Sequence, residues 1–148
     1  MKARKILFPT DFSTCGGAAL KMATSLARDT GATLLIVHVA EPPMAYGGGE
    51  MYYGIPNPVT EDLGKMLEKV VPTDSQVGYE HRLITGDPGN AIVRVAQEES
   101  VDVIVLGTHG RTGLTRLLMG SVAEAVVRRS SCPMFTFKQP SDAEATAK

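Results

Sequence analysis

Short apolar runs alternate along the chain with segments whose apolar residues recur at helical spacing. The run at residues 33–39, TLLIVHV, is almost entirely apolar and largely β-branched, which is typical of a strand buried on both faces of a sheet. Apolar runs also predict strands at residues 5–9, 101–107 and 132–137, and the roughly alternating segment VGYEHRLI predicts one at residues 77–84. Apolar residues three and four positions apart predict helices within residues 10–31, 61–71, 87–100 and 121–130.

The alternation of strand and helix predicts an α/β fold. Strands linked by helices of this length form parallel units with right-handed crossovers, so we expect one open five-stranded parallel sheet with helices on both faces. Asp87 and Pro88 are placed to start a helix, and Gly31 is placed to end one. We expect a single domain over residues 1–138 and a flexible tail at residues 139–148.

Composition and charge exclude several classes of protein. The chain has 148 residues, of which 43% are hydrophobic and 21% are charged, and its formal net charge is −1. A nearly neutral globular domain has no overall field to attract nucleic acid or anionic lipid. The start, MKARKILFPTDF, has too short an apolar run for a signal peptide. Cys15 and Cys132 form no metal-ligand pattern, so we expect reduced thiols in a cytoplasmic protein that binds neither nucleic acid nor membrane.

The segment GTHGRTGLTRLLMGSV, residues 107–122, is the candidate for binding chemistry. Ligands of open parallel sheets bind where strands end and loops lead into helices. Glycines let backbone N–H groups approach an anion closely, and the start of the following helix favours negative charge. Arg111 and Arg116 add local positive charge, although we expect Arg116 to be a solvated surface residue. The segment therefore predicts a phosphate-binding loop.

The glycine spacing separates this loop from better-known phosphate loops. A Walker A loop needs a lysine before the final serine, and a Rossmann loop should follow the first strand. The pattern present is G-x2-G-x9-G-[ST], formed by Gly107, Gly110, Gly120 and Ser121. Spacing alone leaves two structural roles open. The glycines could serve only as turn residues, and Ser121 with Glu124 could form a capping box at the start of the last helix.

A family resemblance rests on longer stretches of sequence. KILFPTDFS, LLIVHV and the continuous segment from GDPGNAIVRV to VVRRSSCPM resemble the universal stress protein family, specifically its ATP-binding subgroup. The resemblance covers nearly the whole chain and implies a Rossmann-like, adenine nucleotide α-hydrolase-like fold with strand order 3-2-1-4-5. It implies ATP, ADP or AMP as the ligand, with Mg²⁺ held through the nucleotide. It says little about the proline- and glycine-rich loop at residues 41–58.

The resemblance also implies which residues form the nucleotide site. The residues expected beside the nucleoside are Pro9, Thr10, Asp11 and Val39. Those expected along the phosphates and ribose are Gly107, His109, Gly110, Arg111, Gly120, Ser121 and Val122. Asp11 is also the candidate for a contact with nucleotide-bound Mg²⁺, although it could instead cap the first helix or close a turn. We expect His109 to orient the loop, because no carboxylate or nucleophile partner is evident in the sequence.

These features predict a stress-response module that binds ATP and acts as a switch, with no catalytic residues and little or no turnover. One alternative is a nucleotide-hydrolysing enzyme of the same fold, and another is a structural dimer without nucleotide. The resemblance further implies a homodimer formed through the strand Cys132–Phe137. Of the other histidines, we expect His38 to be a satisfied polar residue at the sheet edge and His81 to be exposed.

Overall fold

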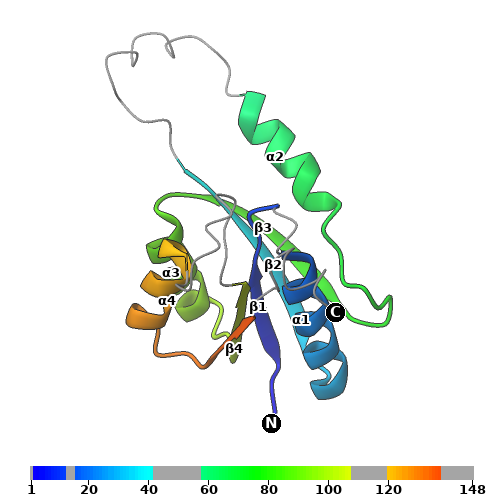
Figure 1. Cartoon of the computed structure of the whole chain (residues 1–148). Coiled ribbons are helices and arrows are strands. Elements are labelled where there is room, and N and C mark those ends of the chain that lie inside the picture. Colours follow the sequence, from blue (N-terminus) through cyan, green and yellow to red (C-terminus); the bar gives the residue numbers. More distant parts are fainter. Residues whose placement is uncertain (1, 13–15, 42–57, 108–119, 138–148) are drawn as a thin grey trace, which may run out of the picture.

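The structure, a computed structural model, describes residues 2–12, 16–41, 58–107 and 120–137. Within these residues strands and helices alternate along the chain, as the sequence predicts (Figure 1). The elements are β1 (Lys5–Pro9), α1 (Gly16–Thr30), β2 (Thr33–Ala40), α2 (Pro58–Glu68), β3 (Tyr79–Thr85), α3 (Pro88–Glu98), β4 (Val103–Gly107), α4 (Ser121–Arg129) and β5 (Met134–Phe137). None of these helices is long and apolar enough to cross a membrane.

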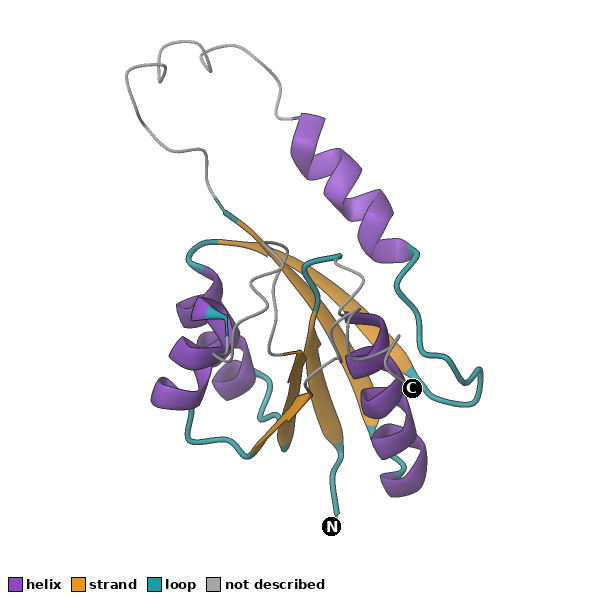
Figure 2. Cartoon of the chain, viewed as in Figure 1, coloured by secondary structure: helices purple, strands orange, loops and turns teal. Residues whose placement is uncertain are grey.

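The strands form one parallel sheet in the order β3-β2-β1-β4-β5, which confirms the predicted topology. β1 lies in the centre, where Pro9 is aligned with Val37 of β2 and Ile6 with Val103 of β4. Helices α1 and α2 cover one face of the sheet, and α3 and α4 cover the other (Figure 2). The carboxyl ends of all strands therefore lie along a single edge.

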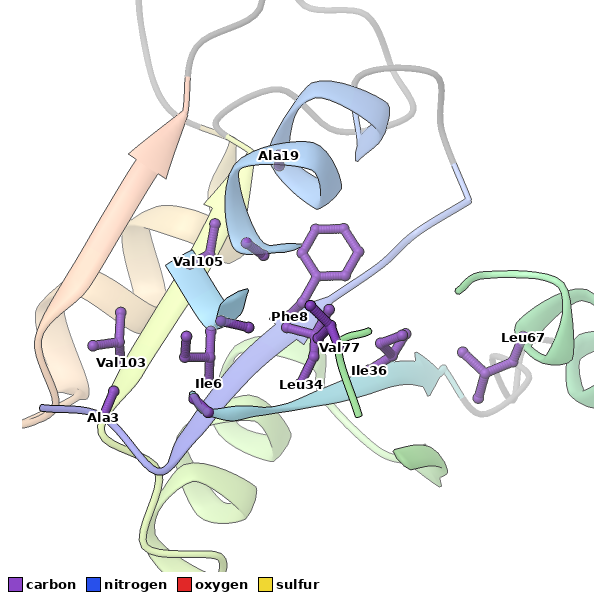
Figure 3. Close-up of a cluster of buried hydrophobic side chains, with 13 residues drawn as sticks. Ala3, Ile6, Phe8, Ala19, Leu34, Ile36, Leu67, Val77, Val103 and Val105 are labelled. Atoms are coloured by element: carbon purple, nitrogen blue, oxygen red, sulfur yellow. The ribbon is translucent and has the colours of Figure 1, made fainter. Parts of the chain in front are cut away.

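One hydrophobic cluster lies between the sheet and α1, on the face of the sheet that α1 covers (Figure 3). It includes Phe8 of β1 and Ile36 of β2, and it extends to α2 through one buried leucine. Three buried alanines at four-residue spacing, Ala19, Ala23 and Ala27, line the side of α1 that faces these strands. Their small side chains let the helix backbone approach the sheet closely.

The second cluster fills the opposite face of the sheet. Leu7 and Val37 project from β1 and β2 against Ile92 and Val95 of α3 and Val126 of α4. Because successive residues of a strand point to opposite faces, β1 and β2 contribute to both clusters. This placement explains why the runs 5–9 and 33–39 are almost continuously apolar.

Helices α3 and α4 pack closely at Gly89. A β-carbon built on this buried glycine would lie 2.7 Å from the β-carbon of Ala125, so a glycine is needed at the contact. The guanidinium of Arg129 in α4 also donates a hydrogen bond to the side-chain oxygen of Asn90 in α3.

The ends of the helices agree with most of the sequence signals. The side chain of Asp87 accepts a hydrogen bond from the Asn90 N–H, and Pro88 occupies the first turn of α3. Gly31 follows α1 with a φ of +76°, the left-handed conformation that favours glycine. The helix predicted at residues 61–71 instead spans Pro58–Glu68. Pro58 suits a first helical position, and Pro72 disfavours helical backbone at the residue before it.

The prediction that His81 is exposed was wrong. Its side chain is half-buried, and its Nε2 lies 2.7 Å from the backbone oxygen of Val70. The ring also meets Tyr79 edge-on, with the ring centroids 5.2 Å apart. His81 thereby attaches β3 to the chain that leaves α2. The tail at residues 139–148 and most of the loop at residues 41–58 lie outside the described residues.

Candidate functional site

The predicted site lies along the carboxyl edge of the sheet, on both sides of β1. The chain leaves β1 for its neighbour β2, whereas β4 lies on the other side of β1. A reversal of strand order of this kind is where open α/β sheets bind ligands, because the connections depart in opposite directions. Pro9 ends β1 and Gly107 ends β4, so both predicted residues lie at this reversal.

The chain that follows β1 is fixed by hydrogen bonds. The Thr10 N–H donates to the Val37 oxygen at 2.8 Å and so extends the β1–β2 pairing by one residue. The Phe12 N–H donates to the hydroxyl oxygen of Thr10 at 3.0 Å, which closes a tight turn around Asp11. Asp11 is half-buried in this turn. The sequence placed Asp11 at the carboxyl end of the first strand, and the structure confirms that placement.

His38 of β2 also contacts this turn. Its Nδ1 lies 2.7 Å from the Thr10 oxygen, and its ring lies against that of Phe12 with the centroids 4.3 Å apart. Only 7% of His38 is exposed, so it is a satisfied polar residue near the end of a buried strand, as the sequence predicts. The neighbouring residue Val39 is buried and packs into the second cluster, on the opposite face of β2.

The start of α4 differs from what a capping box predicts. Gly120 is the N-cap, with φ −60° and ψ 159°, and no side chain of the described residues caps the helix. Ser121 is the first helical residue and is exposed, and Val122 is half-buried. Glu124 forms an ion pair with Arg128 instead of reaching back to the cap. The capping-box alternative for Ser121 was therefore wrong, because the helix begins one residue earlier than that motif requires, with Gly120 and not Ser121 as the N-cap.

The structure thus describes most of the predicted site residues. Pro9, Thr10 and Asp11 lie at the end of β1, beside the strand that carries Val39. Gly107 lies at the end of the neighbouring strand β4, and Gly120 to Val122 form the start of α4. The predicted residues His109, Gly110 and Arg111 lie outside the described part of the chain.

The role of His38 and Phe12 in this turn was missed from the sequence. A histidine within the apolar run 33–39 was the available signal, because a polar side chain in a buried strand needs a hydrogen-bond partner. That partner, the Thr10 oxygen, lies 28 positions away in the sequence and could not be identified without the fold.

At the carboxyl edge of the sheet, the groups best suited to bind a ligand are backbone N–H groups at the start of α4. The first N–H groups of a helix lack partners within the helix, and α4 receives no side-chain cap from the described residues. These groups and the helix dipole are suited to an anion such as phosphate. Among the described residues, no group of histidine, cysteine, aspartate or glutamate side chains could hold a metal ion.

A hollow at the opposite, amino edge has a different character. It has a volume of about 370 Å³ and lies between the ends of α3 and α4 and the chain entering β4 and β5. Burial, together with the charge of Asp102, raises the pKa of the Cys132 thiol, which disfavours the reactive thiolate. The Asp102 carboxylate accepts hydrogen bonds from the backbone N–H groups of Arg4 and Lys5, and these lower its pKa. The polar groups here serve the fold.

A charged network also joins α3 to the amino half of the sheet. The Lys5 ammonium lies 2.8 Å from one carboxylate oxygen of Glu99, and the Arg82 guanidinium lies 2.5 Å from the other. The hydrogen bond from Lys5 and its charge, with the charge of Arg82, lower the pKa of Glu99. Glu99 directly follows α3, so the network anchors the carboxyl end of that helix.

Comparison with known proteins identifies relatives along most of the chain. The family model described as Universal stress protein family matches residues 2–138. Universal stress protein MJ0531 of Methanocaldococcus jannaschii is 33% identical over 141 residues, which cover 93% of this chain and 83% of the relative. Universal stress protein MJ0577 of the same organism is 29% identical over 154 residues, which cover 92% of this chain and 95% of the relative.

Solved structures share the fold. The structure of the MJ0577 protein has a TM-score of 0.83 and 29% identity, and the match covers 95% of this chain and 99% of that one. A universal stress protein in complex with cAMP has a TM-score of 0.61 and 23% identity, with 93% and 98% covered. One from Archaeoglobus fulgidus in complex with dAMP has a TM-score of 0.59 and 21% identity, with 92% and 98% covered.

Proposed function

Since the chain belongs to the universal stress protein family, we propose that it is a cytoplasmic stress-response module that binds an adenine nucleotide, with ATP as the preferred ligand. The observation that carries this proposal is the start of α4. Its N-cap is a glycine, and no described side chain caps its first turn. The backbone N–H groups of this first turn could therefore donate hydrogen bonds to a phosphate, at the carboxyl edge where parallel sheets bind nucleotides.

The nucleoside would lie on the β1 side of this edge. Pro9, Thr10 and Asp11 end β1 beside the strand that carries Val39, and that strand supplies an apolar neighbour for a base. The cAMP and dAMP complexes of the related proteins support an adenine nucleotide as the class of ligand. The G-x2-G-x9-G-[ST] spacing supports ATP within that class. Asp11 would contact Mg²⁺ that is bound to the nucleotide. The phosphate oxygens of the nucleotide would be the other ligands of the ion.

The output of binding would be a change of conformation or partner, with little hydrolysis. Phosphoryl transfer needs metal ligands, neutralisation of the γ-phosphate charge and a group that positions the attacking water. The sequence from Gly107 to Ser121 contains no carboxylate and no lysine. We therefore expect release of phosphate from ATP at less than about one per minute, against typical enzyme turnover of about 1–10³ per second. A rate above about one per second that the substitution His109→Ala abolishes would make this protein an enzyme.

Binding is tested by calorimetric titration of the full chain with ATP, ADP, AMP and cAMP. Gly110→Val should weaken ATP binding by about tenfold or more, because a β-branched side chain resists left-handed backbone and blocks close approach to a phosphate. Gly113→Val is the matched control, because Gly113 lies in the same loop outside the glycine pattern. Equal affinity in both variants, with unchanged circular dichroism, would contradict the phosphate cradle. Tighter binding of AMP than of ATP would reassign the ligand.

The exposed edge of β5 supports the further proposal of a homodimer. β5 is the last strand of the sheet, and 48% of Phe135 is exposed on it. An apolar edge strand favours association unless it is paired or covered, and a second copy of the strand Cys132–Phe137 would pair it. Phe135→Lys should shift the sedimentation coefficient toward that of a monomer. A wild-type protein that is monomeric at tens of micromolar, an ordinary range for homodimers, would contradict the proposal.

A further inference from the structure

The turn that follows β1 is held by a side chain of β2, His38. The Thr10 N–H continues the pairing with β2, but the Thr10 oxygen accepts a hydrogen bond from the His38 side chain at 2.7 Å. A carbonyl oxygen can only accept, so Nδ1 of His38 carries the proton and donates it. The histidine therefore ends the β1–β2 pairing at the residue where the chain turns toward Asp11.

The same ring also contacts the other end of the turn. Phe12 has a φ of +65°, a left-handed conformation that a bulky residue adopts at a cost. Its ring lies 4.3 Å from that of His38, centroid to centroid, and packs against the first hydrophobic cluster. These contacts offset the backbone strain at Phe12. His38 thus touches the residues on both sides of Asp11, through a hydrogen bond at Thr10 and a ring contact at Phe12.

We infer that His38 is a positioning residue for the nucleotide site, because it holds the turn Thr10–Phe12 in the one conformation that presents Asp11 at the carboxyl edge. This inference rests on the proposed function, and His38 would affect nucleotide binding only through the position of Asp11. His38 itself is buried within β2. Without His38, the Thr10 oxygen would lose its hydrogen bond and Phe12 its ring contact, so the turn could adopt several conformations. Ordering the turn would then cost conformational entropy when the ligand binds, and the affinity would fall.

The substitutions His38→Asn and His38→Leu separate this role from simple packing. Asparagine carries an amide N–H at the same number of bonds from Cβ as Nδ1 of histidine, so it can keep the bond to the Thr10 oxygen. Leucine fills similar space but donates nothing. In calorimetric titration with ATP, His38→Leu should weaken binding by about tenfold, the scale of one buried hydrogen bond, and His38→Asn should restore most of the loss.

A double-mutant cycle tests whether the effect passes through Asp11. In an Asp11→Ala background His38→Leu should cause little further loss of ATP affinity, because coupled residues are not additive. Thr24→Val is the matched control. Thr24 is another buried polar residue under the same face, and its hydroxyl donates to the Leu20 oxygen and accepts from the Thr73 N–H. It should lower thermal stability without weakening ATP binding.

Hydrogen exchange measured without nucleotide separates the failure of this inference from that of the proposed function. The Thr10 and Phe12 amides should exchange faster in His38→Leu than in the wild type, and His38→Asn should restore their protection. Unchanged exchange of both amides, or additive losses of affinity in the cycle, would overturn the inference even if the wild type binds ATP. A wild type that binds no nucleotide would overturn the proposed function, and with it the role of His38 in binding.

Discussion

Helices α3 and α4 pack side by side on one face of the sheet, but their first turns are built differently. Helix α3 begins with Asp87, whose carboxylate accepts the Asn90 N–H, and with Pro88 in its first turn. Helix α4 begins with Gly120, and no described side chain caps it. Both helices follow strands of the same parallel sheet, so each runs away from the carboxyl edge.

The contrast agrees with the proposal that the first turn of α3 serves stability and that of α4 binds a ligand. A capped helix start has its N–H groups satisfied within the fold, and an aspartate there repels an anion. A glycine N-cap contributes nearly as much to helix stability but leaves the N–H groups accessible. The two neighbouring helices thus differ at the N-cap residue, aspartate in α3 and glycine in α4, and this is the difference expected between a structural helix start and the proposed phosphate site.

The largest effect is expected from giving α4 the cap that α3 has. Gly120→Asp fits the observed φ of −60° and ψ of 159°, which any residue can adopt. Its carboxylate should occupy the N–H groups of the first turn and repel phosphate, so ATP affinity should fall about a hundredfold, or about 2.7 kcal/mol. Calorimetric titration measures the loss, and urea unfolding should show equal or slightly higher stability.

The reciprocal substitution on α3 is the control. Asp87→Ala should lower the free energy of unfolding by about 1 kcal/mol, the usual value of an N-cap, and leave ATP affinity unchanged. If Asp87→Ala instead weakened ATP binding as strongly as Gly120→Asp, the two helix starts would not be functionally distinct.

A second test concerns the contact that holds the two helices together. Gly89→Ala places a β-carbon 2.7 Å from that of Ala125, so the helices must move apart, at a cost of about 1–2 kcal/mol in the free energy of unfolding. Gly64→Ala in α2 is the matched control, because a β-carbon there has no neighbour within 4 Å. The control should gain about 0.5–1 kcal/mol from helix propensity. Similar changes in the two variants would show that the α3–α4 contact tolerates a side chain.

The smallest effect is expected at the other end of α3, where Glu99 binds Lys5 and Arg82. The lowered pKa of Glu99 means that its interactions stabilise the fold above the ordinary glutamate pKa of about 4.3. This contribution should be lost as the pH falls from about 5 through the lower pKa of the folded protein. Glu99→Gln cannot titrate, so between pH 7 and pH 3 its melting temperature should fall less than that of the wild type. Parallel melting curves would show that the network contributes nothing measurable.

Local patterns predicted most of the fold. The run 33–39 predicted a buried strand because both faces of β2 are covered, and Asp87 and Pro88 predicted the start of α3 because a cap and its helix are adjacent in sequence. His81 was misjudged because its partner, the Val70 oxygen, comes from another element. A sequence pattern cannot indicate a partner that only the packing of α2 against β3 brings into place.

The candidate site likewise has features that the sequence predicted and features that it could not predict. The strand order and the ends of β1 and β4 followed from the alternation of elements and the family resemblance, which put Asp11 and Gly107 at one edge. The start of α4 was ambiguous by one residue, because Gly120 and Ser121 are both acceptable N-caps. The bond between His38 and Thr10 was beyond reach of the sequence, because it forms only when β2 pairs with β1.

The central position of β1 sets the order in which the chain can fold during its synthesis. One edge of β1 can pair with β2 once residue 40 has emerged, but the other waits for β4, which begins at residue 103. Adding residues 41–103, which number 63 (103 − 40), takes about 3–13 s at about 5–20 residues per second. During that time Ile6, Leu7 and Phe8, all fully buried in the finished protein, belong to a strand with one open edge. Open apolar edges recruit other strands, so the nascent chain is most prone to aggregation in this interval.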